Sequence, residues 1–421
     1  MTTTLEERQR LLATRDLPVD LVRVCCVLAV VVLHSLMLGL VVAPDGSVGW
    51  RNVLQSQPWF PVASWFGQLM PLFFLLGGFA SWQGWASVER RGGGARDFLR
   101  PRLLRLGTPA LVWFAAVGAL VWLAIALGLP LPMAQLLARG LGMPLWFLAA
   151  YLICQAAVPF MIRVHRAHPV AGLLVPLAGC VGVDAARFAS GDTTVGLLNL
   201  LFVWPLVQQL GFFYADGSLQ RLPRRVLVLL AAAAFTGVGL LGTSGAYSAD
   251  MLDNLNPPTT PLVLIGVGQA AVFVLAKPAL AALTRTRPVQ AFVGLAGSRL
   301  MTIYLWHLLV VILVAATALI APSVVPAPGT AGWWWSRIPA DLLVFGVLLL
   351  ISLGVARFER GLRALGPAPS SPRLAVALVL AVVPPFWAME VGLDPAGFVW
   401  GTALLAAAVL LARGRPAAAP D

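Results

Sequence analysis

Residues 21–43 read LVRVCCVLAVVVLHSLMLGLVVA, which is long enough to cross a bilayer as one helix of about 20 apolar residues. Two ionisable residues interrupt the run, Arg23 and His34, eleven positions apart. On a helix that spacing is about three turns plus 20°, so both side chains project from one face, with His34 about 16 Å deeper. Asp20 falls within about 40° of His34 around the helix axis. An ionisable group at such depth predicts a functional face rather than a lipid-covered one.

The composition extends the membrane prediction to the whole chain. Of 421 residues, 59% are hydrophobic and only 11% are charged, which excludes a soluble protein of this length. The apolar runs are long and continuous, which favours helices over a barrel. We therefore expect an all-α, polytopic transmembrane helix bundle with about ten core helices and about two further C-terminal helices.

Twelve spanning segments are predicted from these runs. Their limits are 21–43, 59–85, 106–129, 144–162, 170–188, 195–214, 226–241, 262–283, 299–321, 340–357, 374–389 and 396–412. The last two are the weakest, because Pro384-Pro385 interrupts the first of them. In domain terms, 1–20 is a cytoplasmic N-terminal segment, 21–360 the main transmembrane domain, 361–413 an extra helix pair and 414–421 a disordered tail.

The excess of basic residues predicts the topology. The net charge is +12, with 29 Lys and Arg. If the N-terminus is cytoplasmic, only Arg51, Arg139, Arg187 and Arg337 fall on the outer side, and the other 25 lie on the inner side. This distribution indicates a multi-pass plasma-membrane protein with both termini in the cytoplasm, and it excludes nucleic acid as a partner. Trp333-Trp334-Trp335, before the tenth segment, fits an outer-interface position.

Both residues of the first helix also have plainer interpretations. Arg23 can be a snorkelling anchor that sets topology, and His34 can make a helix-packing hydrogen bond. Their shared face favours function, since a neutral imidazole in a protected cavity can take a proton from a hydroxyl. His307 lies about 12 Å in from Arg299 on the ninth segment, and either shares that cavity or is satisfied by packing.

Four other polar residues receive plainer predictions. His165 and His168 are expected on solvated surface of a short inner loop. Asp184 and Arg187 are three residues apart, and a local ion pair is expected between them.

Arginines gather in the predicted inner loop 89–105. Guanidinium groups clamp phosphates through paired hydrogen bonds, so a cluster of this density suits a phosphate-rich ligand. Arg102 and Arg105 share a face if a helix begins there. The alternative is ordinary inner-side charge that attracts anionic lipid.

Several blocks of the sequence together resemble the membrane acyltransferase 3 family. Asp20-Leu-Val-Arg23, followed by ten residues and His34, is similar to that family's opening helix, whose signature is an arginine, ten residues and a histidine. The other similar blocks are Pro71 to Phe79, Arg102-Leu-Leu-Arg105 followed by Pro109, Leu145 to Leu148, and Ile303-Tyr304-Leu-Trp-His307. Gly77 stands where the family has a serine. The resemblance runs from about Asp20 to Arg357 and so covers most of the chain.

The resemblance implies that residues 21–360 form an acyltransferase domain. It implies transfer of an acyl group, commonly acetyl, from cytoplasmic acyl-CoA to a hydroxyl of a carbohydrate, an envelope glycan or a secreted natural product. His34 then acts as general base or relays the acyl group, and Arg23 and Asp20 complete the catalytic set, with Asp20 orienting Arg23 or balancing its charge rather than reacting. The donor phosphates are assigned to Arg102, Arg105, Arg100 and Arg23, and the substrate cavity to Tyr304, His307 and Trp146. No metal is implied.

Two other classes of function stay open at this point. In a proton- or anion-coupled transporter or flippase, Arg23, His34 and His307 would form the coupling path. Against it, the chain shows no two-half symmetry, and its basic cluster occupies one loop. A non-catalytic sensor or assembly partner is the third possibility, and it leaves the alignment of Arg23 with His34 without a purpose.

Overall fold

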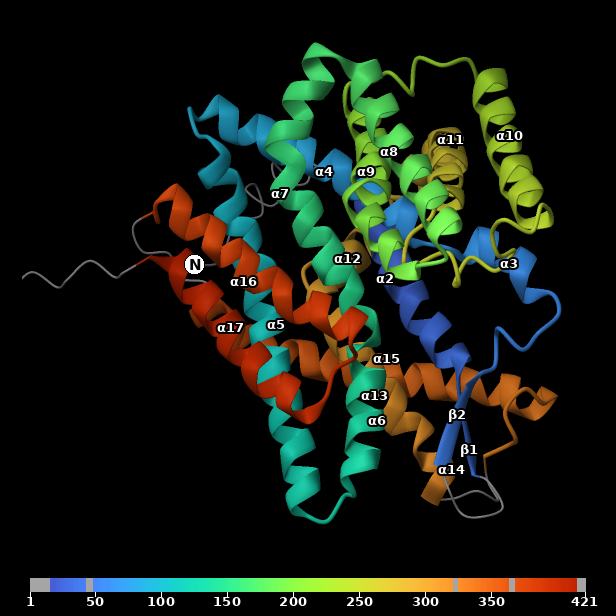
Figure 1. The fold of residues 1–421 in the computed structure, drawn as a ribbon, viewed down its shortest axis with the longest axis vertical. Helices are drawn as coiled ribbons and strands as arrows, with labels where there is room; N and C mark the ends of the chain where they lie inside the picture. The colour runs from blue at the N-terminus through green and yellow to red at the C-terminus, as the bar shows by residue number, and fades with distance from the viewer. Residues whose placement is uncertain (1–15, 43–47, 321–324, 363–367, 415–421) are drawn as a thin grey trace, which may run out of the picture. The chain divides into compact units, whose positions relative to one another are not determined.

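The computed structural model describes residues 16–42, 48–320, 325–362 and 368–414 (Figure 1). Within these ranges the regular structure is helical apart from one two-stranded sheet and an isolated bridge. Twelve stretches are long and apolar enough to cross a membrane. The prediction of an all-α polytopic membrane protein is therefore confirmed. Most of the predicted N-terminal segment and of the predicted C-terminal tail lies outside the described residues.

The chain divides into two compact units. Unit 1 comprises 1–32, 58–79 and 173–300, and unit 2 comprises 33–57, 80–172 and 301–421. Helices α2 (Leu17–Met37) and α4 (Met70–Arg90) contribute to both. Unit 1 also holds α3 (Phe60–Gly67), most of α8 (Pro169–Ser190), η2 (Thr193–Leu201), α9 (Val203–Ala215), α10 (Arg224–Thr243), α11 (Thr260–Leu283) and α12 (Arg287–Gly297). Unit 2 holds β1 (Leu38–Val42), β2 (Val48–Asn52), α5 (Ala95–Ala126), α6 (Leu131–Gly142), η1 (Met143–Leu145), α7 (Trp146–Ala167), α13 (Leu300–Ala315), α14 (Thr317–Ile320), α15 (Ala331–Leu362), α16 (Ser371–Glu390) and α17 (Pro395–Arg413).

Glycines bring α4 and α9 of unit 1 into close contact. A Cβ atom at Gly78 would lie 2.1 Å from the Gln208 carbonyl oxygen, and one at Gly211 would lie 2.0 Å from that of Leu75. No side chain larger than hydrogen fits at either position. Small residues let apolar helices approach closely in a membrane, where the hydrophobic effect does not drive their association.

A buried carboxylate joins three further parts of unit 1. Asp184 of α8 is 1% exposed and accepts hydrogen bonds from the Asn199 amide, the Tyr247 hydroxyl, and both the backbone N–H and the hydroxyl of Thr260. Burial raises the pKa of Tyr247 to about 12, so this phenol stays protonated and donates. The expected ion pair with Arg187 is wrong, because that guanidinium lies 5.0 Å from the ring of Phe188 instead. The loop after α10 is thereby tied to the start of α11.

Unit 2 shows why the predicted inner loop 89–105 is mostly helix. The Gly94 N–H donates to the Asp97 carboxylate at 2.8 Å, so the helix can begin at Ala95 with an acid in its first turn. Helix α5 packs against α17 and α7, and α16 packs against α17 and α7. Helix α16 continues through Pro384 and Pro385, where an interruption was predicted.

Other boundaries also differ from those expected. The first helix ends at Met37, and the next residues pair with β2 as an antiparallel hairpin instead of continuing to Ala43. The second predicted span breaks into α3 and α4. Trp333 to Trp335 lie inside α15 rather than before it.

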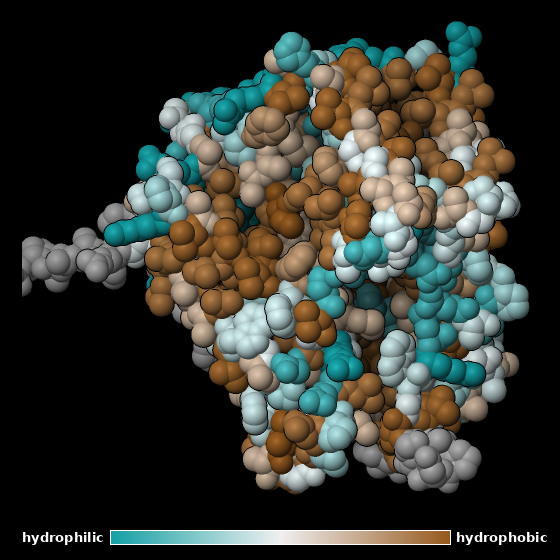
Figure 2. All heavy atoms as spheres, viewed as in Figure 1, coloured by the Kyte–Doolittle hydropathy of each residue, from teal (hydrophilic) through white to brown (hydrophobic). Residues whose placement is uncertain are grey.

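Apolar side chains cover broad areas of the face shown in Figure 2, including the area of α16 and α17. Exposed residues of these two helices include Val376, Val379 and Leu410. A lipid-facing surface accounts for side chains of this kind, which water would disfavour.

We predict that Asp184→Ala destabilises unit 1. The change leaves several buried donors without an acceptor, and each such donor costs about 1–3 kcal/mol. A clear drop in the thermal unfolding midpoint of the detergent-solubilised chain is therefore expected. Asp192→Ala is the matched control, because Asp192 is exposed and its carboxylate bonds only the nearby Thr194. Equal midpoints for the two variants would contradict the prediction.

Candidate functional site

Two histidines from distant parts of the sequence meet in unit 2. The ring centroids of His34, on α2, and His307, on α13, are 4.9 Å apart in an edge-to-face arrangement. His34 is partly exposed, whereas His307 is completely buried. The sequence raised this juxtaposition as one of two possibilities for His307.

Hydrogen bonding fixes the protonation pattern of His307. Its Nδ1 lies in hydrogen-bond contact with the Tyr304 carbonyl, which can only accept, so Nδ1 carries the proton in the neutral ring. Nε2 then has a lone pair, and it is buried with no hydrogen-bond partner in the described part of the chain. The site therefore places a buried imidazole of defined tautomer beside a more accessible one.

An aromatic cluster adjoins His307 through Tyr304, whose ring centroid lies 5.7 Å from that of His307. The Tyr304 hydroxyl donates to the Pro144 carbonyl, and its ring lies edge-on to Phe147 at 4.9 Å between centroids. Phe147 in turn contacts Trp146, which is partly exposed. Of the three predicted cavity residues, Tyr304 and His307 are thus buried, and Trp146 alone presents an accessible ring.

The predicted donor ligand Arg102 is held by its neighbours in unit 2. Its Nε donates to Gln155 Oε1 at 3.1 Å, its Nη1 donates to the Phe98 carbonyl at 3.0 Å, and its Cζ lies 3.5 Å from the centroid of the Phe98 ring. Gln155 is oriented by Ser81 of α4. A Cβ at Gly84 would lie 2.0 Å from Arg102 Nη2, so this glycine leaves the space that the guanidinium fills.

The other two arginines of the predicted cluster differ in their surroundings. Arg105 is exposed, one turn along α5 from Arg102. Arg100 donates from Nε to the Ala412 carbonyl at 2.8 Å and from Nη2 to the Arg413 carbonyl at 2.6 Å. It therefore caps the C-terminal end of α17, where a cation also suits the helix dipole.

Arg23 and Asp20 belong to unit 1. The Arg23 guanidinium carbon lies 5.3 Å from the centroid of Phe73, and its Nε is buried with no hydrogen-bond partner among the described residues. Asp20 lies in the first turn of α2, where an acid suits the helix dipole. Helix α2 is continuous from these residues to His34. Their predicted catalytic roles stay predictions.

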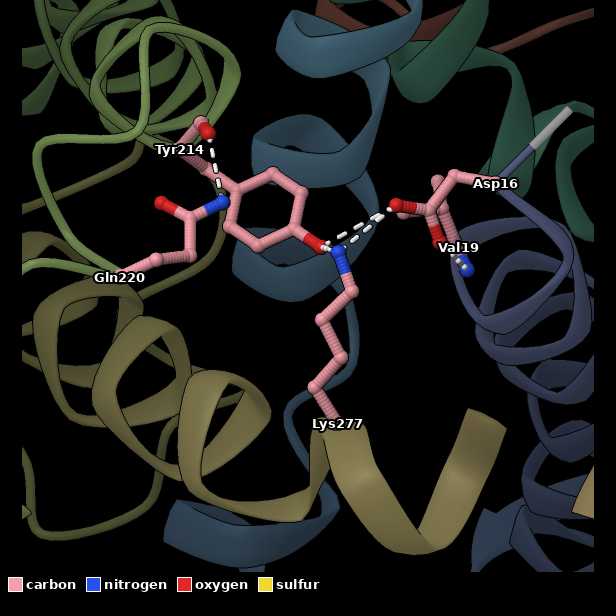
Figure 3. Close-up of polar contacts among 5 residues, drawn as sticks. All are labelled: Asp16, Val19, Tyr214, Gln220 and Lys277. Atoms are coloured by element: carbon pink, nitrogen blue, oxygen red, sulfur yellow. Dashed lines mark hydrogen bonds and ion pairs between the residues drawn. The ribbon is translucent and has the colours of Figure 1, made fainter. Parts of the chain in front are cut away.

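An ion pair in unit 1 was missed from the sequence. Lys277 Nζ on α11 contacts the Asp16 carboxylate at 2.8 Å and the Tyr214 hydroxyl, as Figure 3 shows. The Tyr214 hydroxyl donates to the same carboxylate, and Asp16 also accepts from the Val19 N–H at the start of α2. The three side chains tie α2 to α9 and α11. Lys277 is the only lysine of the chain and interrupts an apolar helix, which was the available signal.

A second correction concerns His165. It was expected on solvated surface, but it is 3% exposed and packs edge-on against Trp82 at 5.4 Å between centroids.

No group of three or more His, Cys, Asp or Glu suited to a metal occurs among the residues that the structure describes.

We predict measurable coupling between Asp16 and Lys277. Removing one partner of this partly buried pair leaves the other charge without compensation, whereas removing both partners leaves no unpaired charge. A double-mutant cycle with Asp16→Asn and Lys277→Met, scored by unfolding free energy, should give a coupling of about 1 kcal/mol or more. Glu89 and Arg166 form a more exposed pair, and the same cycle there should give a smaller value. Additive effects at Asp16 and Lys277 would contradict the assignment.

Comparison with known families identifies the chain. A family model described as an acyltransferase domain matches residues 17–357, from the first residue of α2 into α15. The match includes His34, Arg102 and His307. No curated protein and no solved structure matches the chain. Because the family model covers most of the sequence, the chain belongs to the acyltransferase 3 family, as the sequence predicts.

Proposed function

We propose that this membrane acyltransferase moves an acyl group, in the first instance acetyl, from acyl-CoA to a hydroxyl. The acceptor is a carbohydrate, an envelope glycan or a secreted natural product. The observation that carries the proposal is the pairing of His34 with His307, because a partly exposed imidazole beside a buried neutral one is suited to proton transfer.

In the proposed reaction His34 accepts the proton of the acceptor hydroxyl while its oxygen attacks the thioester carbonyl. The new C–O bond forms, the C–S bond breaks, and the CoA thiolate leaves with the proton that His34 holds. An alternative order forms an acyl-imidazole on His34 first, which the hydroxyl then attacks. His307 acts on this chemistry through His34, because its Nδ1 is engaged with the Tyr304 carbonyl and its ring lies edge-on to that of His34.

The donor is proposed to enter from the cytoplasmic side, where Arg102 and Arg105 meet its phosphates. Arg102 is fixed by Gln155 and Phe98 and so loses little conformational freedom on binding. Arg100 is engaged with the end of α17, so the proposal gives it a smaller part than the sequence suggested. The proposal keeps the predicted roles of Arg23 and Asp20, which lie on the same helix α2 as His34.

The proposed location is the plasma membrane, with both termini in the cytoplasm. The support is the distribution of arginine along the sequence, since inner loops carry the excess of positive charge in most membrane proteins. The donor path then opens to the compartment that supplies acyl-CoA.

We predict that His34→Ala abolishes acyl transfer without loss of folding. Release of the CoA thiol from acetyl-CoA, measured on purified protein with hydroxyl acceptors, should fall by at least about 100-fold, the usual contribution of a general base. The thermal midpoint and the affinity for acetyl-CoA should change little. His168→Ala is the control, because His168 is exposed and distant in sequence from the pair. Wild-type rates in His34→Ala would remove His34 from the mechanism.

We predict that Arg102→Gln weakens donor binding. Hydrogen bonds to charged groups contribute about 1.5–3 kcal/mol, so the KM for acetyl-CoA should rise about tenfold or more, with a smaller effect on the acceptor KM. Arg90→Gln provides the matched comparison, because Arg90 is exposed at the end of α4. If both variants raise the donor KM equally, the arginines act only as diffuse charge and Arg102 has no specific role.

A further inference from the structure

Helix α15 carries two opposite charges whose hydrogen bonds are incomplete. Arg337 is 8% exposed, and its Nε has no hydrogen-bond partner in the described ranges. Asp341, one turn later on the same helix, has a buried Oδ1 that is likewise unpartnered there. Unsatisfied buried groups of this kind are rare in folded proteins, and charged ones are the most costly.

The two side chains do not satisfy one another. Residues four apart on a helix are well placed for an ion pair, yet none joins Arg337 to Asp341 in the described structure. Each is instead held by other neighbours. The Trp333 ring lies 4.7 Å from the Arg337 guanidinium carbon, and Arg337 Nη2 donates to the Ser336 hydroxyl at 3.2 Å. The Arg337 Nε–H and the Asp341 Oδ1 are therefore each left without a partner among the described residues.

Asp341 connects this pair to the histidines. Its carboxylate interacts with the side chain of Ser35, which is 2% exposed and follows His34 directly on α2. Both α15 and this end of α2 belong to unit 2. Asp341 is thus linked through Ser35 to the turn of α2 that carries His34, the proposed base.

The charges restrict which ligand could bind both groups. A phosphate or carboxylate would satisfy Arg337 but would be repelled by Asp341, and an ammonium group would meet the opposite conflict. A hydroxyl accepts from the Arg337 Nε–H and donates to Asp341 Oδ1, and it brings no charge of its own. The complementary ligand is therefore neutral and bears a hydroxyl.

We propose that Arg337 and Asp341 bind one hydroxyl of the acceptor, so that a second hydroxyl of the same molecule reaches His34. The inference rests on the proposed function and adds a requirement to it, which is that the acceptor is a neutral molecule with at least two hydroxyls. Arg337 and Asp341 are then positioning residues for the acceptor. Trp333 and Ser35 hold them in place.

The experiment compares Asp341→Asn and Arg337→Gln with wild type, using methyl α-D-glucopyranoside as the polyhydroxyl probe and 1-propanol as the single-hydroxyl probe. Acceptor-dependent release of CoA from acetyl-CoA should show about a tenfold or larger rise in the KM for the glucoside in both variants, since hydrogen bonds to charged groups are lost. The KM for acetyl-CoA should not change, and 1-propanol should respond little in any variant.

Glu359→Gln is the control, because Glu359 is a buried carboxylate of the same helix that Thr302 already bonds. It should lower the thermal midpoint without changing the glucoside KM. If Asp341→Asn and Arg337→Gln behave as this control does, the two residues bind water or serve stability only, and the proposal is overturned.

A failure of the proposed function is distinguishable from a failure of this site. If wild-type protein releases no CoA, binding of the glucoside is measured directly by calorimetry. Binding that both variants lose supports the hydroxyl site in the absence of acyl transfer. No binding to wild type, or equal binding to the variants, overturns it.

Discussion

The structure depends on the cost of leaving a polar group unpaired in an apolar bundle. In a membrane there is little water to satisfy such a group, so each one must find a partner within the protein. The Asp184 carboxylate takes its hydrogen bonds from three different segments, and Lys277 lies against Asp16 and Tyr214. These contacts fix which helices can be neighbours in unit 1. Apolar packing alone is less selective, because lipid offers similar surroundings.

The same constraint applies to the polar side chains of the candidate site in unit 2. His307 is fixed in one tautomer by the Tyr304 carbonyl, its remaining nitrogen has no hydrogen-bond partner in the described part of the chain, and its ring lies edge-on to that of His34. Arg102 is held by Gln155 and Phe98. In the proposed reaction, side chains held in this way would bind donor and acceptor with little loss of conformational freedom. A histidine with a fixed tautomer beside a second imidazole differs in this way from a histidine that serves packing alone.

The sequence was sufficient for the fold class and the number of spans, because length and hydropathy are local properties. Helix periodicity placed Arg23 and His34 on one helix correctly, but no local pattern reveals that His34 meets His307, 273 positions later. The hairpin after Met37 was missed because Leu38 to Val42 is apolar and also suits a strand. Arg100 was assigned to the donor by composition, whereas its partners on α17 are set by tertiary packing.

The central claim is that His34 and Arg102 serve one acyl-CoA. The most direct measurement is an electron cryo-microscopy structure of the full chain in nanodiscs with S-ethyl-CoA, a thioether that resembles acetyl-CoA but cannot transfer its group. Phosphate density is expected against Arg102 and Arg105, with the sulfur beside the imidazole of His34. Density for the analogue at another place, or His34 out of reach of the sulfur while the phosphates are bound, would show that the two residues do not serve one acyl-CoA.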